Sequence, residues 1–258
     1  MAKKTALVTG AAGGIGQSVV RRLVADKNFK NILLIDHPSR RESLNEFIAS
    51  FPKIPTTPER LTNYCFDLTD LNAGKWLECL VDARGKIDVL INVAGIAPHS
   101  MAPLVKTDLD AAKIIMEVNF WGTAKLCQAV LPFMQANGYG RIINVSSISA
   151  SMKEPGNMIY SASKAGVERL TRSLAIEAPF NKNGPPHDIT VNAVAPGVID
   201  TDMAKQLSGK MVEGYKQATP FGRLGKPEEI AEVIFWLATK APQFLTGEII
   251  RVDGGFLA

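Results

Sequence analysis

The sequence predicts an α/β protein built on one doubly wound, mainly parallel sheet of seven strands with helices on both faces. Short apolar runs alternate with stretches of helical spacing from one end of the 258-residue chain to the other. Parallel strands joined by right-handed crossovers produce this alternation and place helices on both faces of the sheet. No internal repeat or change of composition divides the chain, so we expect a single domain over residues 1–258.

Seven apolar runs have the length and aliphatic composition of strands in a parallel sheet. The first run ends in a glycine-rich turn, and the second ends at an aspartate. We expect strands at residues 5–9, 31–35, 87–91, 141–145, 189–195 and 248–252, with one further strand closing at 64–66.

The stretches between these runs carry apolar residues at helical spacing. Asn119 and Gly122 interrupt one of them at a cost in helix stability, which indicates either simple tolerance or a deliberate local kink. The proline-rich residues 51–58 predict a surface loop. Residues 198–225 have weak periodicity and several helix breakers, which favours a mobile lid over a site. We expect helices at residues 17–27, 42–49, 71–82, 108–135, 159–178 and 227–239.

The composition argues against several classes of function. The net charge of +4 is small and like charges do not cluster, so we expect neither nucleic acid nor a membrane surface as a partner. Cys65, Cys79 and Cys127 are scattered without metal-ligand spacing, which indicates a reducing compartment and no metal. The N-terminus lacks the features of a signal peptide, and no stretch is long enough to cross a bilayer. We therefore expect a cytoplasmic enzyme or binding protein with a small-molecule partner.

A glycine-rich turn stands between the first expected strand and the first expected helix. Small residues let the backbone approach a pyrophosphate, and the helix N-terminus presents free N–H groups to it. A tight turn without a ligand is the alternative, but the position between strand and helix favours a Rossmann-type dinucleotide site. The residues expected to hold the cofactor here are Gly10, Ala12, Gly13, Gly14 and Ile15.

Asp36 ends the second expected strand, 20 residues after Gly16, which is the spacing at which an acidic side chain meets the adenosine ribose. A carboxylate there accepts hydrogen bonds from both ribose hydroxyls and repels a 2′-phosphate, which predicts NAD, with NADP the less favoured cofactor. Arg40 and Arg41 argue the other way, because either guanidinium can reach a phosphate. They follow the strand too late to face the ribose, so we expect Asp36 to dominate.

Tyr160 and Lys164 lie four residues apart and share one face of the expected helix over 159–178. A nearby ammonium favours the phenolate, so inside a water-excluding cleft Lys164 would lower the pKa of Tyr160 toward neutrality. The spacing alone is also typical of an ordinary exposed pair. Ser147, at the carboxyl end of the strand over 141–145, is expected in the same site, because ligands of open α/β sheets bind at those ends.

These residues together resemble the short-chain dehydrogenase/reductase family over nearly the whole chain. The interval of 13 residues between Ser147 and Tyr160 fits the family pattern, whereas Val93 stands where a second asparagine is common. The motifs that carry the resemblance are Thr9-Gly-x3-Gly14-Ile-Gly16, Asn92-x-Ala-Gly95, Asn119, Ser147, Tyr160-x3-Lys164 and Pro196-Gly197-x3-Thr201.

The resemblance implies the catalytic roles. Tyr160 would exchange the proton at the substrate oxygen, and Ser147 would orient that oxygen. Lys164 would lower the pKa of Tyr160 and hold the nicotinamide ribose, while Asn119 would break its helix and hold a water beside Lys164.

The resemblance also implies further cofactor contacts. Asp67 would hydrogen-bond the adenine, and Leu68 would also contact the cofactor. Asn92, Ala94 and Gly95 would flank the adenosine side, and Ile199 and Thr201 would bind the carboxamide. Tyr160 and Lys164 would contact the nicotinamide half.

The expected function is an NAD(H)-dependent oxidoreductase that interconverts a secondary alcohol and a ketone by hydride transfer. The carboxyl-terminal third is similar to the 3-oxoacyl-carrier-protein reductase branch, so an NADPH-dependent reductase of fatty acid synthesis is the alternative. A non-catalytic dinucleotide sensor is a more distant one. Against a carrier-linked substrate, the segments before Arg141 and after residue 178 are poor in the basic residues that dock an acidic carrier. The resemblance further implies a homotetramer.

Overall fold

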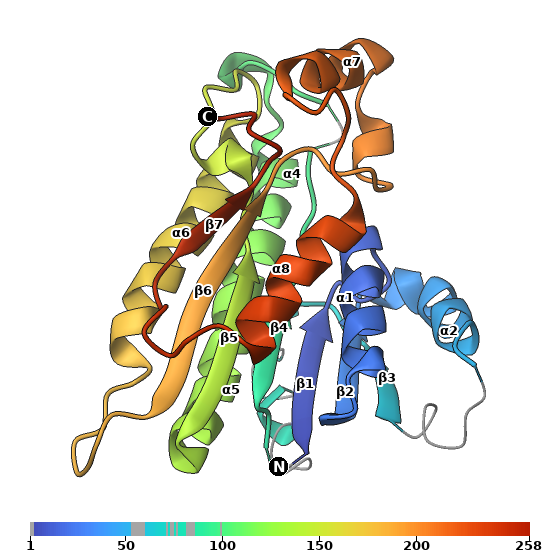
Figure 1. The fold of residues 1–258 in the computed structure, drawn as a ribbon. Coiled ribbons are helices and arrows are strands. Elements are labelled where there is room, and N and C mark those ends of the chain that lie inside the picture. The colour runs from blue at the N-terminus through green and yellow to red at the C-terminus, as the bar shows by residue number, and fades with distance from the viewer. Residues whose placement is uncertain are drawn as a thin grey trace.

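The computed structural model describes residues 3–258 except 53–59, 71, 73, 74, 76, 81–85 and 99. Its strands form one sheet in the order β3-β2-β1-β4-β5-β6-β7, and every neighbouring pair is parallel (Figure 1). The predicted α/β class and the seven-stranded sheet are confirmed. The strands are β1 (Lys4–Thr9), β2 (Phe29–Asp36), β3 (Leu61–Cys65), β4 (Val89–Asn92), β5 (Tyr139–Val145), β6 (Asp188–Pro196) and β7 (Ile249–Val252).

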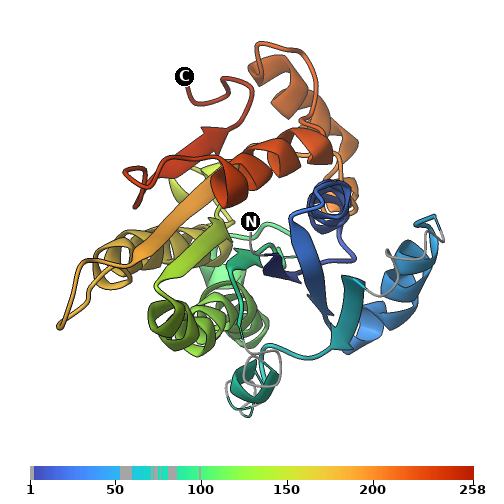
Figure 2. The same ribbon diagram turned by 60° about the horizontal axis from the view of Figure 1, so that its bottom comes forward.

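Helices cover both faces of the sheet, as Figure 2 shows with the bottom of Figure 1 turned forward. One layer contains α1, α2 and α8, and the other contains α5 and α6. The helices are α1 (Gly14–Ala25), α2 (Arg41–Ala49), α4 (Leu109–Met116), the π-helical turn η4 (Glu117–Gly122), α5 (Thr123–Asn137), α6 (Met158–Glu177), α7 (Gly209–Ala218) and α8 (Pro227–Thr239). Short 3-10 turns are η1 (Pro38–Arg40), η3 (Leu104–Lys106), η5 (Ile148–Ala150) and η6 (Ala204–Gln206).

Strand alternation divides the core in two. Leu7 of β1 and Leu33 of β2 pack under α5, whereas Val8 and Leu34, one position on, pack under α1 and α8. All four side chains are fully buried. Each such burial is worth roughly 1.5–3 kcal/mol, which is why these strands carry apolar residues at every position.

Charged contacts fasten the amino-terminal edge of the sheet. The Arg141 guanidinium lies 2.8 Å from Asp188 Oδ1, so it joins β5 to β6. Asp88, just before β4, accepts the backbone N–H of Thr5 at 2.7 Å and pairs with Lys86 at 3.0 Å. These contacts involve none of the residues predicted to bind a cofactor or substrate.

The structure differs from the prediction in two places. The expected helix over 108–135 is divided by η4, and the weakly periodic residues 198–225 contain α7. The expected loop at 51–58 and the expected helix at 71–82 lie partly outside the described residues; within the second, residues 77–80 are helical. Among the helices that the structure describes, none is long and apolar enough to cross a membrane.

Candidate active site

The residues predicted to form the site come together at the carboxyl-terminal edge of the parallel strands. The loop after β1 supplies the glycine-rich turn, β2 ends at Asp36, and Asp67 with Leu68 follows β3. The later strands contribute in the same way. Asn92, Ala94 and Gly95 lie at the end of β4, Ser147 follows β5, Ile199 and Thr201 follow β6, and Tyr160 and Lys164 lie on the first turns of α6.

Lys164 is placed beneath the candidate catalytic tyrosine. It is buried on α6, its Nζ donates a hydrogen bond to the Val145 carbonyl at 2.9 Å, and it lies 5.9 Å from the centroid of the Tyr160 ring. One N–H group of the ammonium is thereby used at the end of β5. The other two remain available to a ligand in the cleft.

The direction in which the pKa of Tyr160 moves differs from the sequence prediction. Burial raises the pKa of Tyr160, a hydrogen bond from Ser147 lowers it, and the charge of Glu154 raises it further. Burial also lowers the pKa of Lys164 to about 8. The cleft desolvates both groups, which the spacing of Tyr160 and Lys164 does not record, and in this structure desolvation dominates.

Asn119 explains the interruption of the long helix. It is fully buried in the π-helical turn η4, where its Oδ1 accepts the Ile96 N–H at 2.8 Å. Its Nδ2 donates to the Ile96 carbonyl and to Ser163 Oγ, each at 3.0 Å. A methyl group built on Gly95 would lie 3.2 Å from Lys164 Nζ and 3.3 Å from Asn119 Oδ1. The kink therefore positions the loop after β4 against the lysine.

Ser146 and Ser147 make their contacts on different sides of the chain, because successive side chains alternate at the end of β5. Ser146 Oγ lies 3.0 Å from Glu168 Oε1 and 3.2 Å from the Lys164 carbonyl, so its one proton is shared between acceptors within the protein. Ser147 Oγ accepts the Ser149 N–H at 3.1 Å, and its own proton is directed at Tyr160, so the two hydroxyls meet where a substrate oxygen would lie.

The glycine-rich turn has the geometry that a dinucleotide requires. Gly10 has a positive φ of 65°, which residues with side chains rarely adopt. A methyl group built on Gly14 would lie 2.8 Å from the Thr201 side chain. The space between the turn and Thr201 therefore depends on the absence of a side chain at residue 14. Helix α1 begins at Gly14, so the free N–H groups of its first turn face this space and could bind a pyrophosphate. The donors present therefore fit the expected cofactor.

Asp36 is tied to the same turn. Its Oδ2 accepts the Ala12 N–H and its Oδ1 accepts the His37 N–H, both at 2.8 Å. Each oxygen keeps a lone pair for a ribose hydroxyl. Arg40, which would favour a 2′-phosphate, donates to the Ala12 carbonyl at 3.4 Å and lies 3.9 Å from Asp202.

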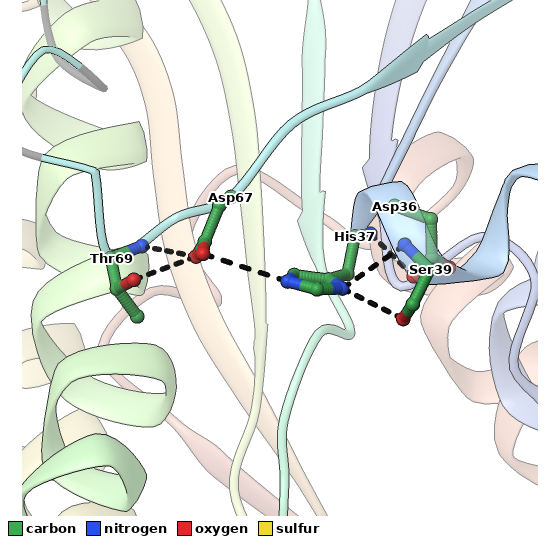
Figure 3. A network of polar contacts seen from close by, with 5 residues as sticks. All are labelled: Asp36, His37, Ser39, Asp67 and Thr69. Atoms are coloured by element: carbon green, nitrogen blue, oxygen red, sulfur yellow. Dashed lines mark hydrogen bonds and ion pairs between the residues drawn. The ribbon is translucent and has the colours of Figure 1, made fainter.

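A polar network not foreseen from the sequence continues from Asp36 across the adenosine end (Figure 3). His37 Nε2 lies 3.5 Å from Asp67 Oδ2, and His37 Nδ1 lies 2.8 Å from Ser39 Oγ. The Thr69 N–H, more than any other contact, holds the pKa of Asp67 below its usual value, and His37 acts in the same direction. His37 therefore connects Asp67, after β3, to Asp36 at the end of β2.

The substrate side is a pocket of about 450 Å³. Its lining includes Ser147 and Tyr160 together with Met203, Leu207 and Met211 from residues 198–225. Three further lining residues were not foreseen: Glu154, Asn157 and Tyr215. Glu154 and Asn157 lie in the interval between Ser147 and Tyr160, and Tyr215 lies on α7, so no spacing in the sequence brings them together.

Comparison with known proteins agrees with this geometry. The family model described as enoyl-(acyl carrier protein) reductase matches residues 10–257. The 3-oxoacyl-[acyl-carrier-protein] reductase FabG of Thermotoga maritima is 35% identical over 256 residues, 98% of each chain. The protein belongs to the short-chain dehydrogenase/reductase family. A cis-4-hydroxycyclohexanecarboxylate dehydrogenase of Sinomonas cyclohexanicum, 36% identical over 100% of this chain and 98% of its own, is a further relative.

Two solved structures with a bound dinucleotide resemble nearly the whole chain. ElxO with NADP bound has a TM-score of 0.84 at 26% identity and covers 99% of both chains. A 3-oxoacyl-[acyl-carrier protein] reductase with bound NAD from Brucella melitensis has a TM-score of 0.83 at 27% identity, over 98% of this chain and 91% of its own. This family member is accordingly an oxidoreductase that acts on CH–OH groups and their ketones with NAD or NADP.

Proposed function

We propose that the protein interconverts a small secondary alcohol and its ketone with NAD(H), using Tyr160 as the acid and base. The arrangement of Ser147 and Tyr160 in one pocket over the buried Lys164 carries the proposal. A bound nicotinamide supplies or accepts the hydride. Ser147 donates a hydrogen bond to the substrate oxygen, and Tyr160 gives that oxygen a proton in reduction or removes it in oxidation.

Lys164 contributes through position and charge. Its Val145 hydrogen bond holds the ammonium beneath Tyr160, and its remaining N–H groups face the cleft where a nicotinamide ribose fits. Its lowered pKa means that the charged form competes with a neutral one near pH 8, so occupancy of the cleft by hydrogen-bond acceptors favours the charged form. The charged form in turn favours the phenolate of Tyr160.

The preference for NAD(H) over NADP(H) is supported by Asp36. A 2′-phosphate would bring negative charge within about 4–5 Å of the carboxylate, at roughly 3–4 kcal/mol for each unit-charge contact at an effective dielectric of about 20. A hundredfold preference needs only about 2.7 kcal/mol. Arg40 would offset part of this cost, but it is already engaged by Ala12 and Asp202.

The substrate we propose is a free small compound or a coenzyme A ester. An acidic carrier needs a basic docking surface, and the segment before β5, residues 136–140, has no charged side chain. The matching segment after α6 has Lys182 alone. The competing function is that of the FabG relatives, an NADPH-dependent 3-oxoacyl-[acyl-carrier-protein] reductase, which the overall similarity favours.

The test is an absorbance screen for oxidation and reduction, with either cofactor, across secondary alcohols, ketones and one carrier-linked 3-oxoacyl group. We expect turnover with NAD(H) and no advantage of the carrier-linked substrate over its small-molecule analogue. Much higher efficiency with the carrier and NADPH would establish the FabG function instead. Cofactor binding without any turnover would indicate a dinucleotide sensor.

The tetramer and the cytoplasmic location remain predictions. Exposed apolar side chains on the α4 and η4 surface, among them Leu109, Ile114 and Trp121, support packing against another subunit. The exposed alanines Ala162 and Ala165 on the first turns of α6 would allow a second helix to approach closely. Point-group symmetry with two-fold axes would use both surfaces at once.

A further inference from the structure

The substrate pocket contains a carboxylate that the proposed chemistry does not use. Glu154 lies in the loop between η5 and α6 and lines the same pocket as Ser147 and Tyr160. Its Oε2 accepts hydrogen bonds from Ser149 Oγ at 3.0 Å and Asn157 Nδ2 at 2.8 Å. Its Oε1 accepts one from Tyr215 Oη at 2.6 Å. Three donors converge on this group, which is the environment of an ionised carboxylate, because the charged form only accepts.

The surroundings of Glu154 leave acceptor capacity unused. A carboxylate offers about four lone-pair positions, and three are occupied here. Asn157 adds another acceptor: its amide is oriented by the bond from Nδ2 to Glu154, and its Oδ1 is buried without a hydrogen-bond partner in the part of the chain that the structure describes. Buried carbonyl oxygens without a partner are uncommon, and each indicates a missing donor. Both residues line the substrate pocket, but Asn157 Oδ1 itself is buried, so the acceptor that faces a substrate is the free lone pair of Glu154.

The contact with Tyr215 places this group opposite the lid. Among the described residues, the hydrogen bond from Tyr215 is the one that joins residues 198–225 to residues 147–160 by side chains. Burial and the neighbouring carboxylate raise the pKa of Tyr215, so the phenol stays protonated and keeps donating. Glu154 is thus held between α7 and α6 in the pocket lining, and its charge raises the pKa of Tyr160.

We propose that Glu154, with Asn157, is the substrate-selecting site of this enzyme: it accepts a hydrogen bond from a hydroxyl group of an uncharged hydroxy-ketone or diol and excludes substrates that carry an anionic group near the reacting carbon. This assignment rests on the proposed alcohol–ketone chemistry. Ser147 and Tyr160 hold the oxygen that reacts, and Glu154, held in place by Asn157, accepts the proton of the second oxygen. A carboxylate in that second position would face Glu154 with a like charge and without a proton to share.

The experiment compares three substrates of one carbon skeleton. Hydroxyacetone, acetone and pyruvate form one set; the hydroxybutanone with its hydroxyl at the chain end, butanone and acetoacetate form a longer one. In the wild type, we expect kcat/KM to be highest for the hydroxy-ketone and lowest for the keto acid in at least one set. In Glu154→Gln, which keeps the shape and removes the charge, we expect the ratio of hydroxy-ketone to keto acid to fall at least about tenfold, the effect of one charged hydrogen bond.

Two further variants separate selection by charge from closure of the lid. Tyr215→Phe removes the donor on α7 and leaves the Glu154 charge in place, so the substrate ratio should stay high even if overall turnover falls. Glu177→Gln removes a carboxylate from the exposed end of α6 and should change nothing. The pH profile gives an independent signal: because the Glu154 charge raises the pKa of Tyr160, the profile of Glu154→Gln should move to lower pH.

The assignment is overturned if the wild type reduces keto acids as efficiently as the matched hydroxy-ketones in both sets. It is equally overturned if Glu154→Gln keeps the wild-type ratio, or if Tyr215→Phe lowers the ratio as much as Glu154→Gln does. Should the Gln variant not fold, the wild-type comparison still decides. Failure of the underlying function looks different, because then the parent ketones are not reduced either, with NADH or with NADPH.

Discussion

Tyr160→Phe would remove the dissociable proton at the reacting oxygen and keep the aromatic ring. We expect turnover to fall by at least about 10²-fold, the low end of what a positioned acid or base contributes, with cofactor affinity little changed. Steady-state kinetics and cofactor titration measure the two effects. Tyr139→Phe is the matched control: its hydroxyl accepts from Lys4 at the amino-terminal edge of the sheet, and its loss should leave turnover intact. Near-normal turnover of the Tyr160 variant would refute the mechanism.

Lys164 should support turnover while lowering the free energy of unfolding. Its pKa of about 8 in the folded protein lies below the ordinary 10.5, so the unfolded chain binds more protons between these values and stability rises with pH across that window. Below pH 8 the buried charge costs on the order of 3 kcal/mol. Lys164→Met removes this cost and the Val145 hydrogen bond together.

The Lys164→Met variant is therefore expected to lose activity and to gain stability relative to the wild type most strongly below pH 8. That gain should shrink as the pH rises toward 10.5, where the wild-type lysine becomes neutral in both states. Thermal unfolding of both proteins at a series of pH values measures this difference. A stability difference independent of pH would contradict the assigned pKa.

Asp36→Ala should shift the cofactor preference toward NADP(H). The substitution removes the charge that repels a 2′-phosphate and leaves Arg40 nearby, so the ratio of specificity constants for NAD(H) and NADP(H) should fall about tenfold or more. Asp110→Ala, which removes an exposed carboxylate from α4, controls for charge alone. Wild-type preference for NADP(H), or no shift in the Asp36 variant, would show that Asp36 does not select the cofactor.

At the scale of elements, the π-helical turn η4 makes a separate prediction. Asn119→Ala would leave the N–H and carbonyl of Ile96 without their partners, at about 1–3 kcal/mol for each buried group left unsatisfied. We expect a lower unfolding temperature together with a loss of turnover, because the loop after β4 lies against Lys164. Asn137→Ala, which removes an exposed amide bonded to the Phe133 carbonyl, should change neither. Equal effects of the two substitutions would leave η4 without a functional role.

The elements also show what the sequence could and could not predict. Strands such as β1 and β4 are buried on both faces, so burial imposed the apolar runs that revealed them. In α7 no residue is buried, because this helix covers the site and not the core. The helix is short, carries Gly209 and Gly214 and has few apolar residues, which is why residues 198–225 predicted a lid without its helix.

The candidate site also contains residues that the sequence could predict and residues that it could not. Residues near a glycine turn or at a strand end were predictable, since chain topology sends every strand end to one edge. Glu154 and Tyr215 are 61 residues apart and meet only in three dimensions. The pKa of Tyr160 was predicted to fall and rises instead, since its direction depends on burial that no spacing records.

For the whole molecule, we expect a homotetramer. The exposed apolar side chains of α4 and η4 would be covered by a second subunit, as the exposed fractions of 56% for Leu109 and 53% for Ile114 require explanation. Light scattering at micromolar concentration should report four chains, and Ile114→Glu should reduce that number. A wild-type monomer under these conditions would contradict the prediction.

The amino-terminal and carboxyl-terminal edges of the sheet have different roles. Ion pairs such as Arg141 with Asp188 and Lys86 with Asp88 fasten the amino-terminal edge, and all the residues assigned to chemistry lie at the opposite one or beside it. Substitutions that change stability and substitutions that change activity are therefore expected at different positions. A more thermostable variant could first be selected from substitutions at the amino-terminal edge. That variant would then tolerate destabilising substitutions in a library confined to residues 198–225, where changes alter the substrates that the enzyme accepts.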